Sequence, residues 1–210
     1  MSVNQEALAR SSKIIDKFNV TSASYQTIGG YLAVQSAITQ PPGTFKAIIA
    51  GYPMLDFKSP FFTQHYTKRP FGRADELPAS IIDEHIATRK PGEIVSAILS
   101  PKRIELAVAV VQHGRFPDML QSNDTSLYPI ETLDSAKSYF PPLFIYHGLN
   151  DSAVEVAGTL EFMRKYREVM PEDKMLVKLV PGEHGFDSTL ELDEPWLKEG
   201  LEFITKEWLG

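Results

Sequence analysis

Apolar residues along the chain fall either in short continuous runs or in stripes spaced three or four residues apart. Three runs are typical of fully buried strands: residues 45–52, 143–147 and 175–180. Helical spacing predicts four helices: residues 4–18, 31–39, 153–169, and a last one that begins near Asp193 and Pro195. Residues 19–24 form a weaker strand candidate. Strands that alternate with helices predict an α/β fold, a mostly parallel sheet with helices on both faces.

The chain between the first two of these strands has a different character. It is rich in Pro, aromatic and charged residues, with helical segments near residues 78–88 and 104–120. The second segment also alternates at period two, but its continuous apolar content favours a helix. We expect one domain over residues 1–210, in which residues 56–137 are inserted as a lid.

The charge balance and the absence of cysteine exclude several classes of function. The chain has 210 residues, a net charge of −6 and no cysteine. The acidic balance disfavours nucleic acid as a partner, because nucleic-acid binding relies on Lys and Arg. A disulfide framework, a Cys nucleophile and a thiolate metal site are excluded. His65, His85 and His113 match no metal template, so no metal is expected.

No targeting or membrane signal is visible in the sequence. No apolar stretch reaches the roughly 20 residues of a membrane span. The N-terminus lacks the cationic start and apolar core of a signal peptide. The C-terminus carries no retention or peroxisomal signal. We therefore expect a cytoplasmic protein.

Residues that can carry chemistry follow two of the predicted strands. One segment runs from His147 to Asp151, and the other from Glu183 through His184 to Asp187. Ligands of open α/β sheets sit at the carboxyl ends of the strands. An Asp and a His there indicate an acid–base pair, in which the carboxylate orients the imidazole and the imidazole takes a proton from a hydroxyl nucleophile. The order nucleophile, Asp, His is that of α/β-hydrolases.

From about residue 29 onward, the chain resembles a lid-bearing α/β-hydrolase of the esterase and lipase branch. The segments that carry the resemblance are residues 29–33, 51–56, 142–148, 151, 183–187 and 194–197. The resemblance implies Asp151 as triad acid and His184 as triad base. It also implies hydrolysis of a small ester, thioester or similar acyl bond, in small-metabolite or natural-product metabolism. It implies no cofactor, and the partner is a small acyl substrate.

The nucleophile position departs from the family pattern. Aligning Gly29 and Gly30 with the end of the Gly-x-Ser-x-Gly elbow places Thr27 where the family has Ser, and Tyr25 where it has Gly. A β-branched residue suits the strained elbow badly, although Thr is a nucleophile in other settings. Thr27 is the candidate nucleophile, and the backbone amide of Ile28 is the candidate oxyanion donor.

The family's first strands and its His-Gly-Gly loop have no counterpart upstream of residue 29. We expect an α/β-hydrolase fold with its N-terminal strands missing. Two interpretations stay open: a truncated or mis-joined version of a longer hydrolase, and a short relative that has lost catalysis. The first strand would then be an exposed sheet edge, through which copies of the chain can pair as a homo-oligomer.

Each candidate also has a purely structural alternative. Asp151 can cap the helix that follows it, Asp187 can shape its loop, and His147 can pack at the sheet edge. Aromatic residues of the lid either line an apolar pocket or simply pack the lid: Phe57, Phe61, Phe62, Tyr66 and Phe71. Two other functions stay open: a binding protein without turnover, and a peptidase of the prolyl-peptidase type.

Overall fold

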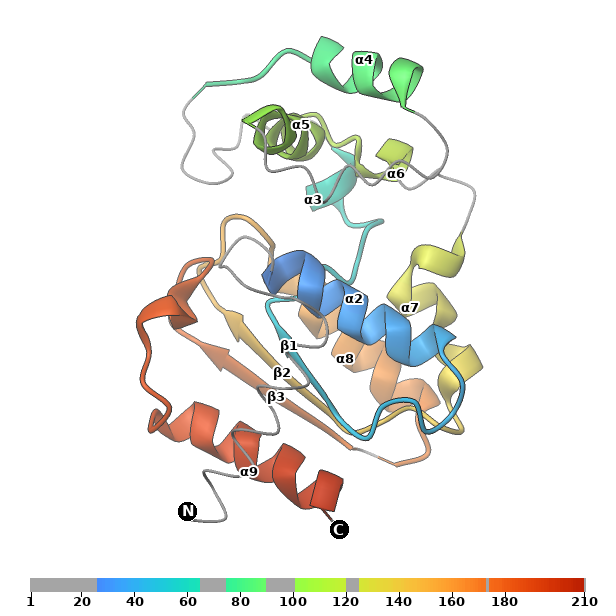
Figure 1. Cartoon of the computed structure of the whole chain (residues 1–210), viewed down its shortest axis with the longest axis vertical. Coiled ribbons are helices and arrows are strands. Elements are labelled where there is room, and N and C mark those ends of the chain that lie inside the picture. Colours follow the sequence, from blue (N-terminus) through green and yellow to red (C-terminus); the bar gives the residue numbers. More distant parts are fainter. Residues whose placement is uncertain (1–25, 65–74, 90–100, 120–124, 173, 210) are drawn as a thin grey trace. The chain divides into compact units, whose positions relative to one another are not determined.

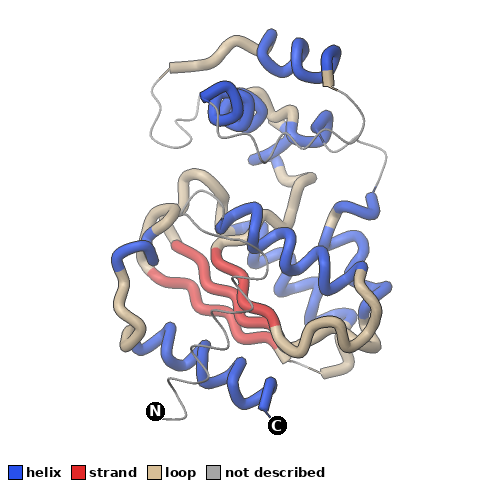
Figure 2. The backbone as a smooth tube through the Cα atoms, viewed as in Figure 1, coloured by secondary structure: helices blue, strands red, loops and turns tan. Residues whose placement is uncertain are grey.

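The computed structural model describes residues 26–64, 75–89, 101–119, 125–172 and 174–209 (Figures 1 and 2). The chain divides into two compact units. The first comprises Met1–Leu55 and Pro129–Gly210, and the second comprises Asp56–Tyr128. The predicted helix over residues 4–18 and the strand over 19–24 lie outside the described residues.

A parallel sheet forms the centre of the first unit. Its strands, in the order β1-β2-β3, are Ile48–Gly51, Leu143–Gly148 and Met175–Val180. Ile48 pairs with Leu143, which pairs with Met175, so the three strands run in step. Their carboxyl ends therefore meet at one edge of the sheet. All three predicted strands and the predicted α/β class are confirmed.

Helices cover both faces of this sheet (Figure 1). On one face lie α2 (Gln26–Thr39), α7 (Pro129–Thr132), the 3-10 helix η5 (Leu133–Ala136) and α8 (Ala157–Val169). The other face carries α9 (Pro195–Leu209). Successive side chains of β2 point to opposite faces of the sheet. Ile145 packs in the core on the side of α2 and α8, whereas Phe144 packs against Gly200 of α9.

Helix α8 begins later than its sequence pattern predicts. The helix was expected from residue 153, but it starts at Ala157. Thr159, Phe162 and Tyr166 form its buried face, whereas Leu160 is 40% exposed. The loop before the helix is held by a carboxylate at its start, as described below, so the chain cannot enter the helix earlier.

The second unit consists of short helices around two apolar clusters. The elements are α3 (Pro60–Thr63), α4 (Ser80–Thr88), α5 (Pro101–Gln112), α6 (Phe116–Met119) and the 3-10 helix η4 (Thr125–Leu127). The predicted helix near 78–88 is confirmed, and the segment near 104–120 is helical but divided, since α5 ends at Gln112 and α6 begins at Phe116 after Gly114 with its φ of +61°. The strand alternative for the second is wrong, because its apolar residues Leu106, Ala109 and Val110 pack against Ile82 of α4.

Aromatic side chains form the other cluster of this unit. Phe57, Phe61 and Phe62 are almost fully buried, and Phe57 stacks on Phe116 with centroids 4.7 Å apart. These contacts agree with the packing interpretation. Tyr66 and Phe71 lie outside the described residues. The unit ends at Tyr128, earlier than the expected lid boundary at residue 137, because Leu133 and Ala136 are buried in the core of the first unit.

Candidate active site

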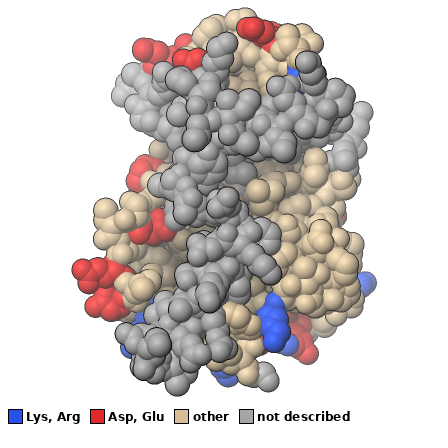
Figure 3. All heavy atoms as spheres, viewed as in Figure 1, with Lys and Arg blue, Asp and Glu red and all other residues tan. Residues whose placement is uncertain are grey.

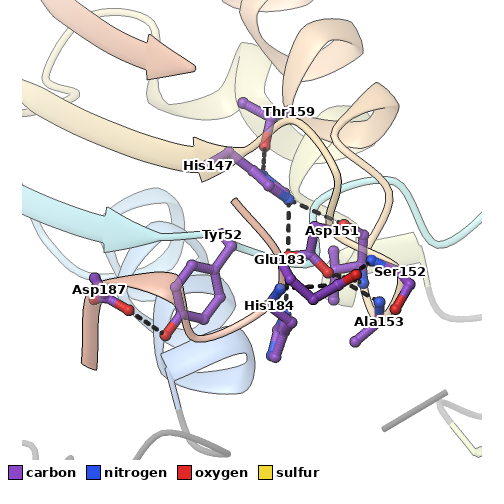
Figure 4. Close-up of polar contacts among 10 residues, drawn as sticks. Tyr52, His147, Asp151, Ser152, Ala153, Thr159, Glu183, His184 and Asp187 are labelled. Carbon is purple, nitrogen blue, oxygen red and sulfur yellow. Dashed lines mark hydrogen bonds and ion pairs between the residues drawn. The ribbon is translucent and has the colours of Figure 1, made fainter. Parts of the chain in front are cut away.

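Asp151 and His184 lie in the loops that follow β2 and β3, and their side chains meet (Figure 4). The distance from His184 Nδ1 to Asp151 Oδ2 is 2.8 Å. The Asp151 side chain is fully buried and that of His184 is 12% exposed. Glycine permits this approach: a Cβ at Gly148 would lie 2.5 Å from the carbonyl oxygen of Gly182. The parallel register and these small residues bring the predicted acid and base together.

The carboxylate of Asp151 is surrounded by donors. Oδ1 accepts the backbone N–H groups of Ala153 and Val154, at 2.9 and 2.8 Å. Burial by itself raises the pKa of Asp151. Hydrogen bonds from His147, His184 and the Val154 amide, with the charge of His184, outweigh it and lower the pKa to about 2. Asp151 is therefore ionised at neutral pH. It holds its own loop rather than capping α8, so the helix-cap alternative is wrong.

Donor and acceptor roles fix the tautomers of both histidines. An ionised carboxylate can only accept, so His184 Nδ1 carries the proton and its Nε2 is the basic nitrogen. His147, fully buried, places Nε2 3.0 Å from the carbonyl oxygen of Val154, so this nitrogen must donate. Its Nδ1 then accepts the hydroxyl of Thr159 at 2.8 Å. The Nε2–H of His147 also faces Asp151 Oδ2, at 3.4 Å.

Glu183 joins the acid loop to the base loop. Its Oε1 accepts the backbone N–H of Ser152 at 2.5 Å and that of His184 at 2.9 Å. Glu183 is exposed to solvent, yet its carboxylate links the loop that contains Asp151 to the loop that contains His184 (Figure 4). The role of this glutamate was not predictable from the sequence, because it depends on a contact between two loops.

A second carboxylate, Asp187, binds two tyrosines. Its Oδ1 accepts the hydroxyl of Tyr52 at 3.1 Å, and its Oδ2 that of Tyr146 at 2.8 Å. Burial, reinforced by the charge of Asp187, raises the pKa of both tyrosines, so both hydroxyls remain donors. The contacts agree with the loop-shaping interpretation of Asp187. Neither tyrosine was predicted from the sequence to be a site residue.

The predicted nucleophile lies in the first turn of α2. The structure describes the backbone of Thr27 and Ile28 but not their side chains, so both roles stay predictions. The start of α2 adjoins the carboxyl end of β1, since a Cβ at Gly30 would lie 2.9 Å from the carbonyl oxygen of Gly51. The helix thus begins at the edge of the sheet from which the loops of Asp151 and His184 emerge (Figure 1).

His85 and His113 lie in or beside helices of the second unit. His113 Nε2 is 2.7 Å from the carbonyl oxygen of Leu77, and His85 belongs to α4. His65 lies outside the described residues. Within the described ranges, no cluster of three or more His, Cys, Asp or Glu side chains could hold a metal ion. Likewise, none of the helices in the described part of the chain is long and apolar enough to cross a membrane.

The sequence of the chain is similar to that of a known protein. The chain is 28% identical over 186 residues to the probable carboxylesterase M8 of Phoma sp., and the match covers 87% of this chain. The predicted resemblance is confirmed: the chain is similar to carboxylesterases of the α/β-hydrolase type. It spans 58% of the length of that relative. No protein-family model matches the chain.

Two solved structures can be aligned with the chain. A Staphylococcus aureus protein of unknown function aligns with a TM-score of 0.53 and 16% identity, over 86% of this chain and 61% of that one. The Pyrococcus furiosus esterase Pf2001 aligns with a TM-score of 0.47 and 14% identity, over 86% and 51% of the two chains. The first of these alignments shows a common fold.

Proposed function

We propose that the chain is a carboxylic ester hydrolase that works by acyl transfer to a hydroxyl group. The observation that carries this proposal is the 2.8 Å hydrogen bond between His184 Nδ1 and the buried, ionised Asp151. It leaves His184 Nε2 as a general base oriented by a carboxylate. The similarity to a probable carboxylesterase supports the same chemistry.

In the proposed reaction, Thr27 is the nucleophile. His184 Nε2 takes the Thr27 hydroxyl proton while Oγ1 bonds to the acyl carbon, and the carbonyl electron pair moves to oxygen, where the Ile28 amide donates to it. The intermediate collapses, the ester C–O bond breaks, and the leaving alkoxide takes the proton from His184. Water repeats the sequence on the acyl-enzyme and releases the acid. Asp151 remains ionised and stabilises the imidazolium throughout.

We propose a small, uncharged ester or thioester as substrate, with the second unit, Asp56–Tyr128, as its lid. The chain carries a net charge of −6, which disfavours anionic substrates. On the face shown in Figure 3, the described Lys and Arg side chains are interspersed with Asp and Glu and do not gather into a basic stripe. This distribution agrees with a small-molecule substrate rather than nucleic acid.

Hydrolysis of p-nitrophenyl acetate, butyrate and octanoate tests the function. We expect His184→Gln and Asp151→Asn to lower kcat by about 10⁴-fold or more. Thr27→Val should abolish turnover, because valine keeps the shape and lacks the hydroxyl, whereas Thr27→Ser should retain it. Thr39→Val, at an exposed threonine at the far end of α2, is the matched control. Unchanged hydrolysis in Thr27→Val would exclude Thr27 as nucleophile, and ester binding without turnover in the natural chain would favour the non-catalytic binding protein.

A further inference from the structure

Tyr52 occupies an unusual backbone conformation at the carboxyl end of β1. Its φ is +31°, the one positive value among the described residues other than glycine. Such conformations persist where the surroundings over-determine them, and they cluster at functional sites. Here the Tyr52 N–H donates to the carbonyl oxygen of Tyr146 at 2.7 Å, which extends the β1–β2 pairing by one residue. The side chain of Tyr52 is completely buried.

The Tyr52 ring is held at its far end as well. Its hydroxyl and that of Tyr146 share the carboxylate of Asp187, and the two rings meet edge to face, with centroids 6.0 Å apart. Gly51 leaves the room that Tyr146 needs, because a Cβ there would lie 2.6 Å from the Tyr146 hydroxyl oxygen. Tyr52, Tyr146 and Asp187, which we call the tyrosine bracket, thus form a rigid unit across β1, β2 and the loop after β3.

The bracket presents the Tyr52 ring to the imidazole of His184. The two ring centroids are 4.6 Å apart, and the planes are inclined at 60°. Asp151 holds one edge of the imidazole through Nδ1. Rotation of the imidazole about its Cβ–Cγ bond would break this hydrogen bond and move Nε2. The Tyr52 ring blocks this movement from the side.

We propose that Tyr52 is a positioning residue that fixes the plane of the His184 imidazole, and that Asp187 acts through the Tyr52 hydroxyl. The proposal rests on the proposed function, because it assigns His184 as the base. It accounts for the strained backbone of Tyr52, for its complete burial and for the hydrogen bonds that Asp187 accepts from two tyrosine hydroxyls. It also means that Tyr52, which precedes His184 by more than 130 positions in the sequence, helps to orient the proposed base.

Three variants separate the elements of this proposal. Tyr52→Leu removes the ring, and Tyr52→Phe keeps the ring but removes its bond to Asp187. Tyr139→Phe is the matched control, since the Tyr139 hydroxyl donates to the carbonyl oxygen of Ile38, in the same unit but outside the bracket. We expect Tyr52→Leu to lower kcat by about 10- to 100-fold, the effect of a small misplacement of a reacting group. Tyr52→Phe should have a smaller effect in the same direction, with KM little changed in both.

A spectroscopic measurement tests the geometry without turnover. ¹⁵N NMR of the imidazole distinguishes the Nδ1–H from the Nε2–H tautomer, and the His184→Gln variant identifies the His184 signals. We expect the Nδ1–H form in the natural chain and a mixture in Tyr52→Leu, with Tyr139→Phe unchanged. If the natural chain hydrolyses no ester, a tautomer change in Tyr52→Leu still supports the positioning role, and the proposed function fails separately.

Defined outcomes would overturn the proposal. If folded Tyr52→Leu shows the natural kcat and the natural His184 tautomer, Tyr52 does not position the imidazole. If circular dichroism shows that Tyr52→Leu does not fold, the test depends on Tyr52→Phe. A natural kcat and a natural His184 tautomer in Tyr52→Phe would show that the hydrogen bond to Asp187 has no positioning role, and would refute the proposed tyrosine bracket. A loss of kcat in Tyr139→Phe equal to that in Tyr52→Phe would also refute it, because the effect would not be specific to the bracket.

Discussion

Ionised Asp151 stabilises the folded sheet unit, and we expect this stabilisation to disappear in acid. The folded protein holds the pKa of Asp151 at about 2, against 3.8 for an unperturbed aspartate. Between these values the unfolded chain binds the proton more readily than the folded one. The free energy of unfolding therefore rises with pH in this window. The contribution is complete above about pH 5 and is lost as the pH falls through the folded pKa.

The size of this effect follows from the two pKa values. The fully buried carboxylate of Asp151 is protected from solvent screening, so its shift needs no discount for exposure. A difference of just under two pK units, at 1.36 kcal/mol each, corresponds to about 2.4 kcal/mol at neutral pH. Roughly two thirds of it should be lost by about pH 2.5. That is a large share of a typical domain stability of about 5–15 kcal/mol.

Urea unfolding of Asp151→Asn against the natural chain measures this contribution. The two tryptophans, Trp196 and Trp208, both lie on α9, so their fluorescence reports the sheet unit. We expect the difference in unfolding free energy between the two proteins to shrink by about 1.5 kcal/mol from pH 6 to pH 2.5. Asp193→Asn, at an exposed aspartate, should show no such change. A difference that stays constant over this range would refute the linkage to Asp151.

Two further substitutions test the packing around the site. Gly200→Ala places a Cβ 2.0 Å from the ring of buried Phe144, and we expect a net loss of about 1–3 kcal/mol in urea unfolding despite alanine's better helix propensity. Exposed Lys198→Ala is the control, and an unchanged stability in Gly200→Ala would contradict the close contact. Thr159→Val leaves His147 Nδ1 without its donor and should lower the unfolding free energy by about 1–3 kcal/mol. Thr39→Val, exposed on α2, should change it by less than about 0.5 kcal/mol, and equal effects would contradict a stabilising buried hydrogen bond between Thr159 and His147.

Elements with a strong apolar pattern were predictable from the sequence. The continuous runs around Ile48, Leu143 and Met175 have the composition of strands buried on both faces, and they form the parallel sheet. The start of α8 was not predictable in this way. A helical period extends back to residue 153, but two backbone N–H groups of that segment donate to the Asp151 carboxylate and hold the segment in a turn.

The same contrast applies to the site. Asp151 and His184 follow strands directly, so the topology of a parallel sheet is enough to place them at one edge. Tyr52 was missed because its importance lies in a hydrogen bond to Asp187, 135 positions away, and in a ring contact with His184. Glu183 was missed for the same reason. Side chains that act through tertiary contacts leave no periodic or spacing signal.

The proposed acid–base pair and the proposed nucleophile belong to separate parts of the sheet unit, and this separation can be tested directly. Among the side chains that the structure describes, the contacts to Asp151 and His184 come from the ends of β1, β2 and β3 and the loops that follow, whereas Thr27 belongs to α2. We therefore expect Thr27→Val to lose turnover while His184 keeps its Nδ1–H tautomer in ¹⁵N NMR. Tyr52→Leu should alter both measurements. A changed His184 tautomer in Thr27→Val would show that the first turn of α2 helps to hold the imidazole, and that the pair is not assembled by the strand ends alone.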